Sequence, residues 1–590
     1  MRFHLPIEEE ELEKGKFEIK TLKFLFPYFK THLPLFILIN ILLFLGTGIM
    51  VISPVLLKRI IDVNIPNKDF RGLLFTVLIY AVLSAISYFI NLTQRVQITK
   101  LGEKIASQIK SDLFSHLLYS PITFFDKTPV GKIITRNESD VESLKMLFTS
   151  TAVTLFQDLV FLIGISIVMI IVSPLLYLIL FFLFPLFFLA FYFFSKKIRP
   201  IYLIIRRKVS EINNLISETL QGLFIIQVFK KEDYFRKKMD DLGKERMNLE
   251  IKGMGYWYRL WFLIDFGEVL AITLVLFFGS LLALKGKTTI GTLVLFFSYI
   301  IRLFQPLRGL SDLLNIFQRA IAAGERIFAL KKMEREEEKI SLKEIPKKLE
   351  KSIRFLNVNF SYLEDLLVLH NINLEIKRGE KVALVGETGS GKTTIISLLL
   401  GFYQPTSGEI FINDLPYSQI PKSLIRRLIS YVPQEIILFP GSVLDNLRLF
   451  NEEISEEKVI EATKRVKIYE RIKEFPEGFN TNILERGINL SLGERQLLSF
   501  ARAMVFEPEI IILDEATSSV DPYTELLIQE GLFELWKGKT AIVIAHRLAT
   551  VKNVERIIVI HKGKIVEEGS HDELLKKEGY YYKLYQLQYV

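Results

Sequence analysis

Six apolar segments in the first half of the 590-residue chain constrain its fold more than any other feature. Each is close to the ~20 residues that a helix needs to cross ~30 Å of hydrocarbon. They are Leu35–Leu57, Leu73–Leu92, Thr151–Val172, Leu175–Phe194, Leu260–Leu284 and Ile290–Phe304. The last is the weakest, because Arg302 interrupts it. The pattern predicts a membrane domain of six helices.

The connections between these segments predict an orientation. Three are short, at Asp62–Arg71, Ser173–Pro174 and Lys285–Gly291, whereas Arg95–Ser150 and Ser195–Arg259 are long and rich in Lys and Arg. Basic loops stay on the cytoplasmic side, so both long loops and both termini are expected there. Their helix-compatible patterns predict membrane helices that continue into the cytoplasm as long rods.

Composition excludes several classes of site. With no cysteine there can be no disulfide, thiolate metal site or Cys nucleophile, and hence no attached Cys peptidase. The net charge of +9 does not indicate nucleic acid, since much of it flanks apolar segments.

The rest of the chain divides by composition. Residues 1–19 lack the layout of a signal peptide and are expected to be a cytoplasmic extension. The transmembrane domain is predicted at 20–330, opening with a helix at the membrane surface. Residues 331–351 are highly charged and predict a linker. Short apolar runs then alternate with helical stretches, so 352–590 is expected to be a soluble α/β domain.

A phosphate-binding motif lies in that last domain. Gly386–Thr393 fits G-x-x-x-x-G-K-[ST], with an apolar strand, Lys381–Val385, before it and a helix start after it. Strand, Gly-rich loop and helix together direct backbone N–H groups and a positive dipole end at one anion. Lys392 is predicted to contact the β- and γ-phosphates, and Thr393 to bind Mg²⁺.

A second apolar strand ends in acids. Ile510–Leu513 suits a buried parallel strand, and Asp514 and Glu515 follow at the end where α/β sheets place ligands. Asp514 is expected to hold Mg²⁺ and Glu515 to polarise the attacking water. His546 follows a third strand, Ala541–Ala545, and a lone His there is more often structural.

Several stretches, in this order, resemble the nucleotide-binding domains of ABC transporters. They are Gly386–Thr393, Gln434 in Tyr-Val-Pro-Gln, Leu490-Ser491-Leu492-Gly493-Glu494, Ile510–Glu515, Ser519-Val520-Asp521 and His546. With six membrane segments ahead of them, the chain resembles a half-transporter of the exporter type. The fold class implied is an all-α membrane domain with cytoplasmic helical extensions, followed by an α/β P-loop ATPase domain.

The resemblance implies a role for each matched residue. Glu515 is the expected catalytic base, with His546 at the γ-phosphate and Gln434 linking the Mg²⁺ and water site to the membrane domain. Tyr362 is expected to stack on adenine, and Asp521 to sit between the two sites of a dimer. The complete set of nucleotide-binding residues implied is Tyr362, Gly386, Glu387, Thr388, Gly389, Ser390, Gly391, Lys392, Thr393, Thr394, Ser491, Gly493 and Asp521, and the Mg²⁺ ligands are Thr393, Gln434 and Asp514.

The signature departs from the family's usual L-S-G-G-Q. Leu492 adds a bulky side chain, and Glu494 adds negative charge near phosphate. This is either tolerated drift or the mark of an asymmetric heterodimer with one poor site. Robust, cooperative ATP hydrolysis by the purified chain alone would exclude the asymmetric arrangement.

Two groups of residues are coupling and transport candidates. Phe124 and Phe125 mark the first loop tip by resemblance, and are expected either to anchor it or to face a core.

Ionisable residues within apolar segments are costly and usually functional. They are Asp158, Asp265, Glu268 and Arg302. Glu268 and Arg302 lie at comparable depth, so they line a cavity or form a structural pair; neutralising them singly and together in a transport assay separates these roles.

The function expected is ATP-driven export or flipping of an amphipathic, lipid-like or drug-like solute by a dimer, with ATP and Mg²⁺ as cofactors. The partners expected are membrane lipid and a second half-transporter, in a homodimer or a heterodimer. The alternative is an ATP-gated channel or regulator on the same frame. A soluble ATPase that works on DNA does not fit the six membrane segments, and importers usually carry the two domains on separate chains.

Overall fold

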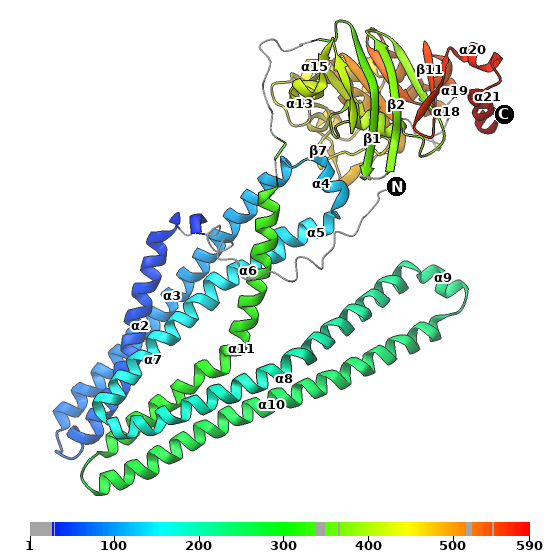
Figure 1. Cartoon of the computed structure of the whole chain (residues 1–590). Coiled ribbons are helices and arrows are strands. Elements are labelled where there is room, and N and C mark those ends of the chain that lie inside the picture. Colours follow the sequence, from blue (N-terminus) through cyan, green and yellow to red (C-terminus); the bar gives the residue numbers. More distant parts are fainter. Residues whose placement is uncertain are drawn as a thin grey trace. The chain divides into compact units, whose positions relative to one another are not determined.

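The computed structural model describes residues 26–28, 30–333, 335–336, 348–363, 366–514, 522–545 and 548–589. The chain forms two compact units (Figure 1). The helical unit comprises Met1–Ser120 and Lys127–Met333, and the C-terminal unit comprises Pro121–Asp126 and Glu334–Val590. The short segment Pro121–Asp126 therefore groups with residues more than 200 positions later in the chain.

The helical unit is built of long helices. Its helices are α2 (Leu33–Arg59), η2 (Ile60–Asn64), α3 (Phe70–Leu118), α5 (Val130–Thr135), η3 (Arg136–Asp140), α6 (Val141–Met146), η4 (Leu147–Thr151), α7 (Ala152–Val172), α8 (Pro174–Gln221), α9 (Leu223–Val228), α10 (Glu232–Leu284) and α11 (Ile290–Lys332). At 1.5 Å per residue, the 53 residues of α10 extend for about 80 Å, well beyond the ~30 Å of a bilayer core. The predicted extension of the membrane helices beyond the apolar segments is confirmed.

Breaks between these helices fall where the chain has turn residues. Helix α3 ends before Pro121, and α8 ends at Gly222, which caps it and leads into the short helix α9. Helices α8 and α10 then pack against each other along their length (Figure 1). The two form an antiparallel hairpin whose tip is α9.

Four described helical stretches are long and apolar enough to cross a membrane: Leu33–Asn64, Phe70–Leu118, Val130–Val172 and Glu232–Leu284. Two shorter apolar helical stretches, Pro174–Leu183 and Ile290–Pro306, lie in α8 and α11. Each of these six stretches contains or overlaps one of the six predicted segments. The fourth, Pro174–Leu183, covers the first half of the predicted Leu175–Phe194, whereas the sixth spans the whole of the predicted Ile290–Phe304, and each belongs to a helix of more than 40 residues.

A proline in α2 explains why the charged residue Arg302 lies in the apolar part of α11. Pro54 has no backbone N–H, so the carbonyl of Met50, four residues earlier, loses its helical donor. Arg302 Nη1 donates to that carbonyl oxygen at 3.1 Å, and the Tyr299 hydroxyl donates to the next one, of Val51, at 2.5 Å. Arg302 therefore satisfies a backbone group inside the helix bundle.

The C-terminal unit contains two main sheets. The antiparallel sheet has the order β2-β1-β4-β5, with β1 (Ser352–Leu363), β2 (Leu366–Lys377), β4 (Ser407–Ile412) and β5 (Leu415–Pro416). The six-stranded sheet has the order β12-β11-β3-β10-β9-β6, with β3 (Lys381–Val385), β6 (Ile429–Val432), β9 (Ile510–Asp514), β10 (Thr540–Ile544), β11 (Arg556–His561) and β12 (Lys564–Gly569). Strands β7 (Gly441–Ser442) and β8 (Asn482–Ile483) form a separate pair.

The three apolar runs singled out in the sequence are strands β3, β9 and β10, which together with β6 form four neighbouring parallel strands. Alternate residues of β9 enter different cores, Ile511 and Leu513 on one face of the sheet and Ile510 and Ile512 on the other. Burial on both faces explains why the run is apolar throughout. Since these strands are parallel, their carboxyl ends meet at one edge.

The helices of this unit cover and connect the sheets. They are α4 (Ile122–Lys127), α12 (Lys392–Leu399), η5 (Tyr417–Gln419), α13 (Lys422–Leu428), α14 (Val443–Arg448), α15 (Glu456–Arg465), α16 (Tyr469–Lys473), η6 (Gly478–Asn480), η7 (Glu485–Gly487), α17 (Leu492–Val505), α18 (Pro522–Trp536), α19 (Leu548–Lys552), α20 (His571–Lys576) and α21 (Tyr580–Tyr589). Helix α4 ends one residue beyond the segment that groups with this unit.

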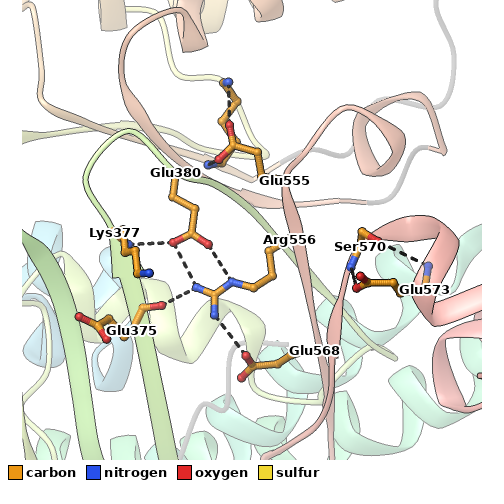
Figure 2. A network of polar contacts seen from close by, with 9 residues as sticks. Glu375, Lys377, Glu380, Glu555, Arg556, Glu568, Ser570 and Glu573 are labelled. Atoms are coloured by element: carbon orange, nitrogen blue, oxygen red, sulfur yellow. Dashed lines mark hydrogen bonds and ion pairs between the residues drawn. The ribbon is translucent and has the colours of Figure 1, made fainter.

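A charged network lies at the amino ends of β3 and β11 in the six-stranded sheet, opposite the carboxyl ends of the parallel strands (Figure 2). Arg556, at the start of β11, holds the carboxylate of Glu380 with Nε at 2.8 Å and Nη2 at 3.2 Å, and donates to Glu568 at 3.2 Å. It also donates to the backbone carbonyl of Glu375 in β2. The network thereby joins the two sheets at the amino ends of β3 and β11, away from the edge that carries the phosphate loop.

Candidate nucleotide-binding site

The phosphate loop follows β3 and leads into α12, as its sequence predicts. Gly391 caps α12 in the left-handed region, with φ +109°, which a residue with a Cβ rarely adopts. Gly386 is required for another reason, because a Cβ there would lie 2.2 Å from the carbonyl oxygen of Ile560 in β11. The loop therefore owes its shape both to backbone conformation and to close packing on the neighbouring strand.

Lys392 lies inside this loop and not on its surface. Its side chain is 6 % exposed, and Nζ donates to the carbonyl oxygens of Gly386 at 2.7 Å and Glu387 at 2.8 Å. Burial lowers the pKa of the Lys392 ammonium, and the negative charges of Asp514 and Glu387 oppose that shift. A partly desolvated cation held within a ring of loop backbone is suited to binding an anion.

The loop also contains an unsatisfied hydroxyl. The Ser390 Oγ is buried and has no hydrogen-bond partner among the described residues, whereas Ser390 N donates to Glu387 O at 3.1 Å. A buried polar atom without a partner is costly unless a ligand or water satisfies it. Together with Lys392, this hydroxyl fits a phosphate group of a nucleotide.

Asp514 ends β9, near enough to the loop for its charge to act on Lys392. Tyr431, on the adjacent strand β6, lies with its hydroxyl 3.5 Å from Asp514 Oδ2. Burial, reinforced by the charge of Asp514, raises the pKa of Tyr431 to about 12, so the phenol stays protonated. Thr393 is exposed at the start of α12. A carboxylate and a hydroxyl are oxygen donors of the type that Mg²⁺ prefers.

Gln434 lies beside Asp514. Both line one small cavity of about 20 Å³, together with Gln496 of helix α17. The Gln496 Oε1 is buried and has no hydrogen-bond partner among the described residues. The lining of this cavity is mostly apolar, and its volume is enough for one water molecule beside these three polar side chains. Gln496 was missed by sequence reasoning, because nothing in its local pattern separates it from an ordinary helix residue.

Tyr362 lies next to the phosphate-loop helix. Its side chain is 43 % exposed, and its hydroxyl is 3.2 Å from Thr394 Oγ1 in α12. Its ring contacts Tyr403 edge to face, with centroids 5.1 Å apart, and Phe360 at 4.8 Å. A half-exposed ring beside the loop is suitably placed to stack on a base, which stays a prediction.

The signature forms the start of α17. Ser491 is the N-cap residue, and Gly493 lies buried in the first turn. Ser491 Oγ accepts from Glu494 N at 3.2 Å, and Glu494 Oε2 accepts from Ser491 N at 2.7 Å, which completes a capping box. Leu492 is 36 % exposed, so its side chain points at least partly to solvent.

Helix α4 contains the predicted coupling residues. Phe124 and Phe125 are half-buried and meet edge to face, with centroids 5.2 Å apart. The next residue, Asp126, accepts a hydrogen bond from the Tyr403 hydroxyl. Tyr403 thus connects α4 with the ring of Tyr362. Sequence reasoning missed it, because the contact spans 277 residues.

Some predicted site residues lie outside the described residues. These are Glu515, Asp521 and His546, whose assignments stay predictions. The membrane candidates are described: Asp158 lies in α7, Asp265 and Glu268 in α10, and Arg302 in α11. The Arg302 guanidinium donates to the carbonyl oxygen of Met50, and its pairing with Glu268 stays a prediction.

Comparison with known proteins agrees with this arrangement. Residues 36–307 match the family "ABC transporter transmembrane region", and residues 369–518 match the family "ABC transporter". The second match covers the phosphate loop, the signature and β9.

Curated relatives align over most of the chain. An uncharacterized ABC transporter ATP-binding protein, YknV of Bacillus subtilis (strain 168), is 34% identical over 578 residues, covering 97% of this chain and 94% of that protein. The ATP-dependent lipid A-core flippase of Syntrophus aciditrophicus (strain SB) is 35% identical over 517 residues, covering 87% and 84%. The multidrug resistance-like ATP-binding protein MdlB of Buchnera aphidicola subsp. Schizaphis graminum (strain Sg) is 33% identical over 560 residues, covering 94% and 95%.

A solved structure, of a bacterial Atm1-family ABC exporter with ATP bound, has the same fold. It superposes with a TM-score of 0.77 at 22% identity and covers 94% of this chain and 98% of that one. With a transmembrane region and a nucleotide-binding domain fused in one chain, and with relatives alike over nearly its whole length, the chain belongs to the ABC transporter family and is an integral membrane protein of the exporter type.

Proposed function

We propose that the chain is an ATP-hydrolysing exporter or flippase that works as a dimer and moves an amphipathic, lipid-like or drug-like solute by alternating access. We place the chain in the plasma (inner) membrane, with both termini and the C-terminal unit in the cytoplasm. One observation carries this proposal. The buried Lys392, Asp514 and the N-terminus of α17 at Ser491 lie in a nucleotide-binding domain that is fused to a transmembrane region. Relatives named as a lipid A-core flippase and as multidrug resistance-like proteins support the solute class.

The residues divide the chemistry among them. The loop N–H groups and Lys392 bind and orient the phosphates, and Glu515 takes the proton from the attacking water. Mg²⁺, held by Thr393 and Asp514, would neutralise phosphate charge. In the dimer, Ser491 and Gly493 of one copy contact the γ-phosphate bound to the other. ATP then becomes part of the interface, so its binding stabilises closure and its hydrolysis releases it.

Reconstitution into sealed vesicles tests the proposal. With the C-terminal unit facing out, Mg-ATP should drive net accumulation of a fluorescent phospholipid analogue or a cationic dye against its gradient. Such uphill movement requires repeated hydrolysis. An ATP-gated channel, the alternative function, would let solute run downhill only, and would stay open with a non-hydrolysable ATP analogue. Downhill flux of that kind would therefore contradict export.

Helix α4 is proposed to couple the two units. The change Phe125→Asp would place a charge beside Phe124 in the packed aromatic pair, and we expect it to remove most substrate stimulation of ATP hydrolysis. Nucleotide binding should stay unchanged, because the phosphate loop is not altered. The measurement is hydrolysis with and without the stimulating lipid or drug, alongside binding of a fluorescent ATP analogue.

The neighbouring exposed lysine provides a control. Lys127→Ala removes a charge from the end of the same helix and should leave stimulation intact. Unchanged stimulation in Phe125→Asp would show that this pair does not transmit the signal.

A further inference from the structure

Glu494 stands at the signature position where the family usually has glutamine. A free carboxylate there would oppose the function proposed above, because it sits in the first turn of α17, where the helix dipole attracts phosphate. In the structure this carboxylate is not free. Oε2 accepts from the backbone N–H of Ser491 at 2.7 Å, and Oε1 accepts from Arg471 Nε at 2.5 Å.

Arg471 reaches Glu494 from a different helix, α16, 23 residues earlier in the chain. A second bond, from Nη1 to Glu474 at 2.6 Å, holds the other side of the guanidinium. The plane of Arg471 also lies over the Phe475 ring, 5.9 Å from its centroid. These contacts restrain Arg471, so its alignment with Glu494 is built into the fold.

Burial makes this pair stronger than a surface pair. The Glu494 side chain is only 12 % exposed, although Arg471 is 56 % exposed. Burial alone would raise the pKa of Glu494, but the bonds from Ser491 N–H and Arg471 outweigh it and lower that pKa. Glu494 therefore stays ionised, and its charge persists unless a cation compensates it.

The capping box determines what Ser491 can offer. Ser491 Oγ already accepts from Glu494 N at 3.2 Å, so its hydroxyl hydrogen stays available for donation. A hydroxyl donor and the N–H groups of the first turn of α17 can bind a phosphate oxygen together, provided that no net negative charge lies beside them.

We propose that Arg471 is a positioning residue of the signature, which neutralises Glu494 so that Ser491 and the start of α17 can bind the γ-phosphate of ATP held by the partner copy. The inference rests on the proposed dimeric ATPase. A neutralised Glu494 no longer repels phosphate, so its charge is no reason to expect a signature that binds phosphate poorly. Of the two departures that suggested an asymmetric heterodimer, only Leu492 then remains.

The test is a double-mutant cycle on the full chain in lipid nanodiscs, with the KM for ATP and kcat measured at low and high salt. Arg471→Ala leaves the Glu494 charge uncompensated and should raise KM at least tenfold, less so at high salt because salt screens the repulsion. Glu494→Gln should keep the wild-type KM or lower it. The double variant, Arg471→Ala with Glu494→Gln, should regain the KM of Glu494→Gln, because the charge that needed compensation is gone.

Lys473→Ala is the matched control. It removes one positive charge from the same helix, but Lys473 pairs with Glu470, at 3.2 Å, and not with Glu494. Its KM should match that of wild type. A melting curve for each variant separates unfolding from a charge effect, since rescue by Glu494→Gln cannot repair a collapsed helix α16.

The outcomes distinguish this inference from the function that it extends. Wild-type chain that fails to hydrolyse ATP overturns the proposed function, and this inference with it. Wild-type hydrolysis with an unchanged KM in Arg471→Ala overturns the inference alone. A double variant as impaired as Arg471→Ala also overturns it, because Arg471 would then act through something other than Glu494.

Discussion

Replacing Lys392 by alanine is expected to lower ATP hydrolysis at least about 100-fold, in line with the loss of one preorganised donor to a developing anion. The Lys392 ammonium is buried within the loop and bonded to two of its carbonyls. Alanine would remove the only cation of the motif Gly386–Thr393. The measurement is release of inorganic phosphate by the purified chain, with binding of a fluorescent ATP analogue in parallel.

Two further variants sharpen this test. Lys392→Arg keeps the charge, but its planar guanidinium cannot fit a space closed by the carbonyls of Gly386 and Glu387, so it should be nearly as inactive. Lys381→Ala is the control at the start of β3, the strand that leads into the loop, where Lys381 pairs with Glu555 at 3.2 Å. Full activity in Lys392→Ala would show that this loop is not the phosphate-binding site.

Replacing Glu515 by glutamine is expected to lower the turnover of ATP by roughly 10²–10⁴-fold, the usual contribution of a general base. Binding should survive, because the phosphate loop and Asp514 are untouched. ATP that binds without being cleaved would hold the dimer closed. The measurement compares single-turnover hydrolysis with retention of radiolabelled ATP after rapid gel filtration.

The absence of cysteine allows the closed state to be trapped covalently. Cysteines placed at the exposed Thr388 in the phosphate loop and at Leu492 in the signature would face each other across the proposed dimer. In the Glu515→Gln background they should cross-link between copies when ATP is present. Each single-cysteine variant is a control and should stay monomeric on a denaturing gel. ATP-independent cross-linking would argue against closure by nucleotide.

Glu509→Gln is the matched control for the Glu515→Gln variant. Glu509 directly precedes β9, five residues before Asp514, so this change alters a glutamate at the other end of the same strand. Its turnover should equal that of wild type. If Glu515→Gln hydrolyses ATP as fast as Glu509→Gln, Glu515 is not the base.

The parallel strands show why part of the fold could be predicted. Strands buried on both faces must be apolar along their whole length, so β3 and β9 stand out in the sequence. The Gly-rich loop was equally visible, because φ +109° at Gly391 and the close approach at Gly386 permit few other residues. Local backbone requirements of this kind restrict which residue types can occupy a position, so they can be recognised in the sequence.

Side-chain pairing across the fold could not be predicted in the same way. Glu494 suggested a repulsive charge in the signature, whereas Arg471, in a separate helix, compensates it at 2.5 Å. Similarly, the sequence left open whether Arg302 lines a cavity or forms a structural pair, and only the fold shows that its guanidinium donates to the carbonyl that Pro54 leaves free in α2. The partner lies 23 residues away in the first case and 252 in the second, and no spacing rule connects either pair.

The amino-acid sequence alone determined the membrane segments, the phosphate loop with its flanking strand, and the order of the nucleotide-binding elements. These depend on hydrophobic length, on local backbone geometry and on the identity of consecutive residues, all of which are properties of short stretches. Only the tertiary structure decided that Glu494 is neutralised by Arg471, that Tyr403 joins Asp126 to the ring of Tyr362, and that Gln434 shares a cavity with Asp514 and Gln496. The electrostatic environment of a side chain depends on what folding brings beside it, because the energy of a charge depends on distance in space and not on separation along the chain.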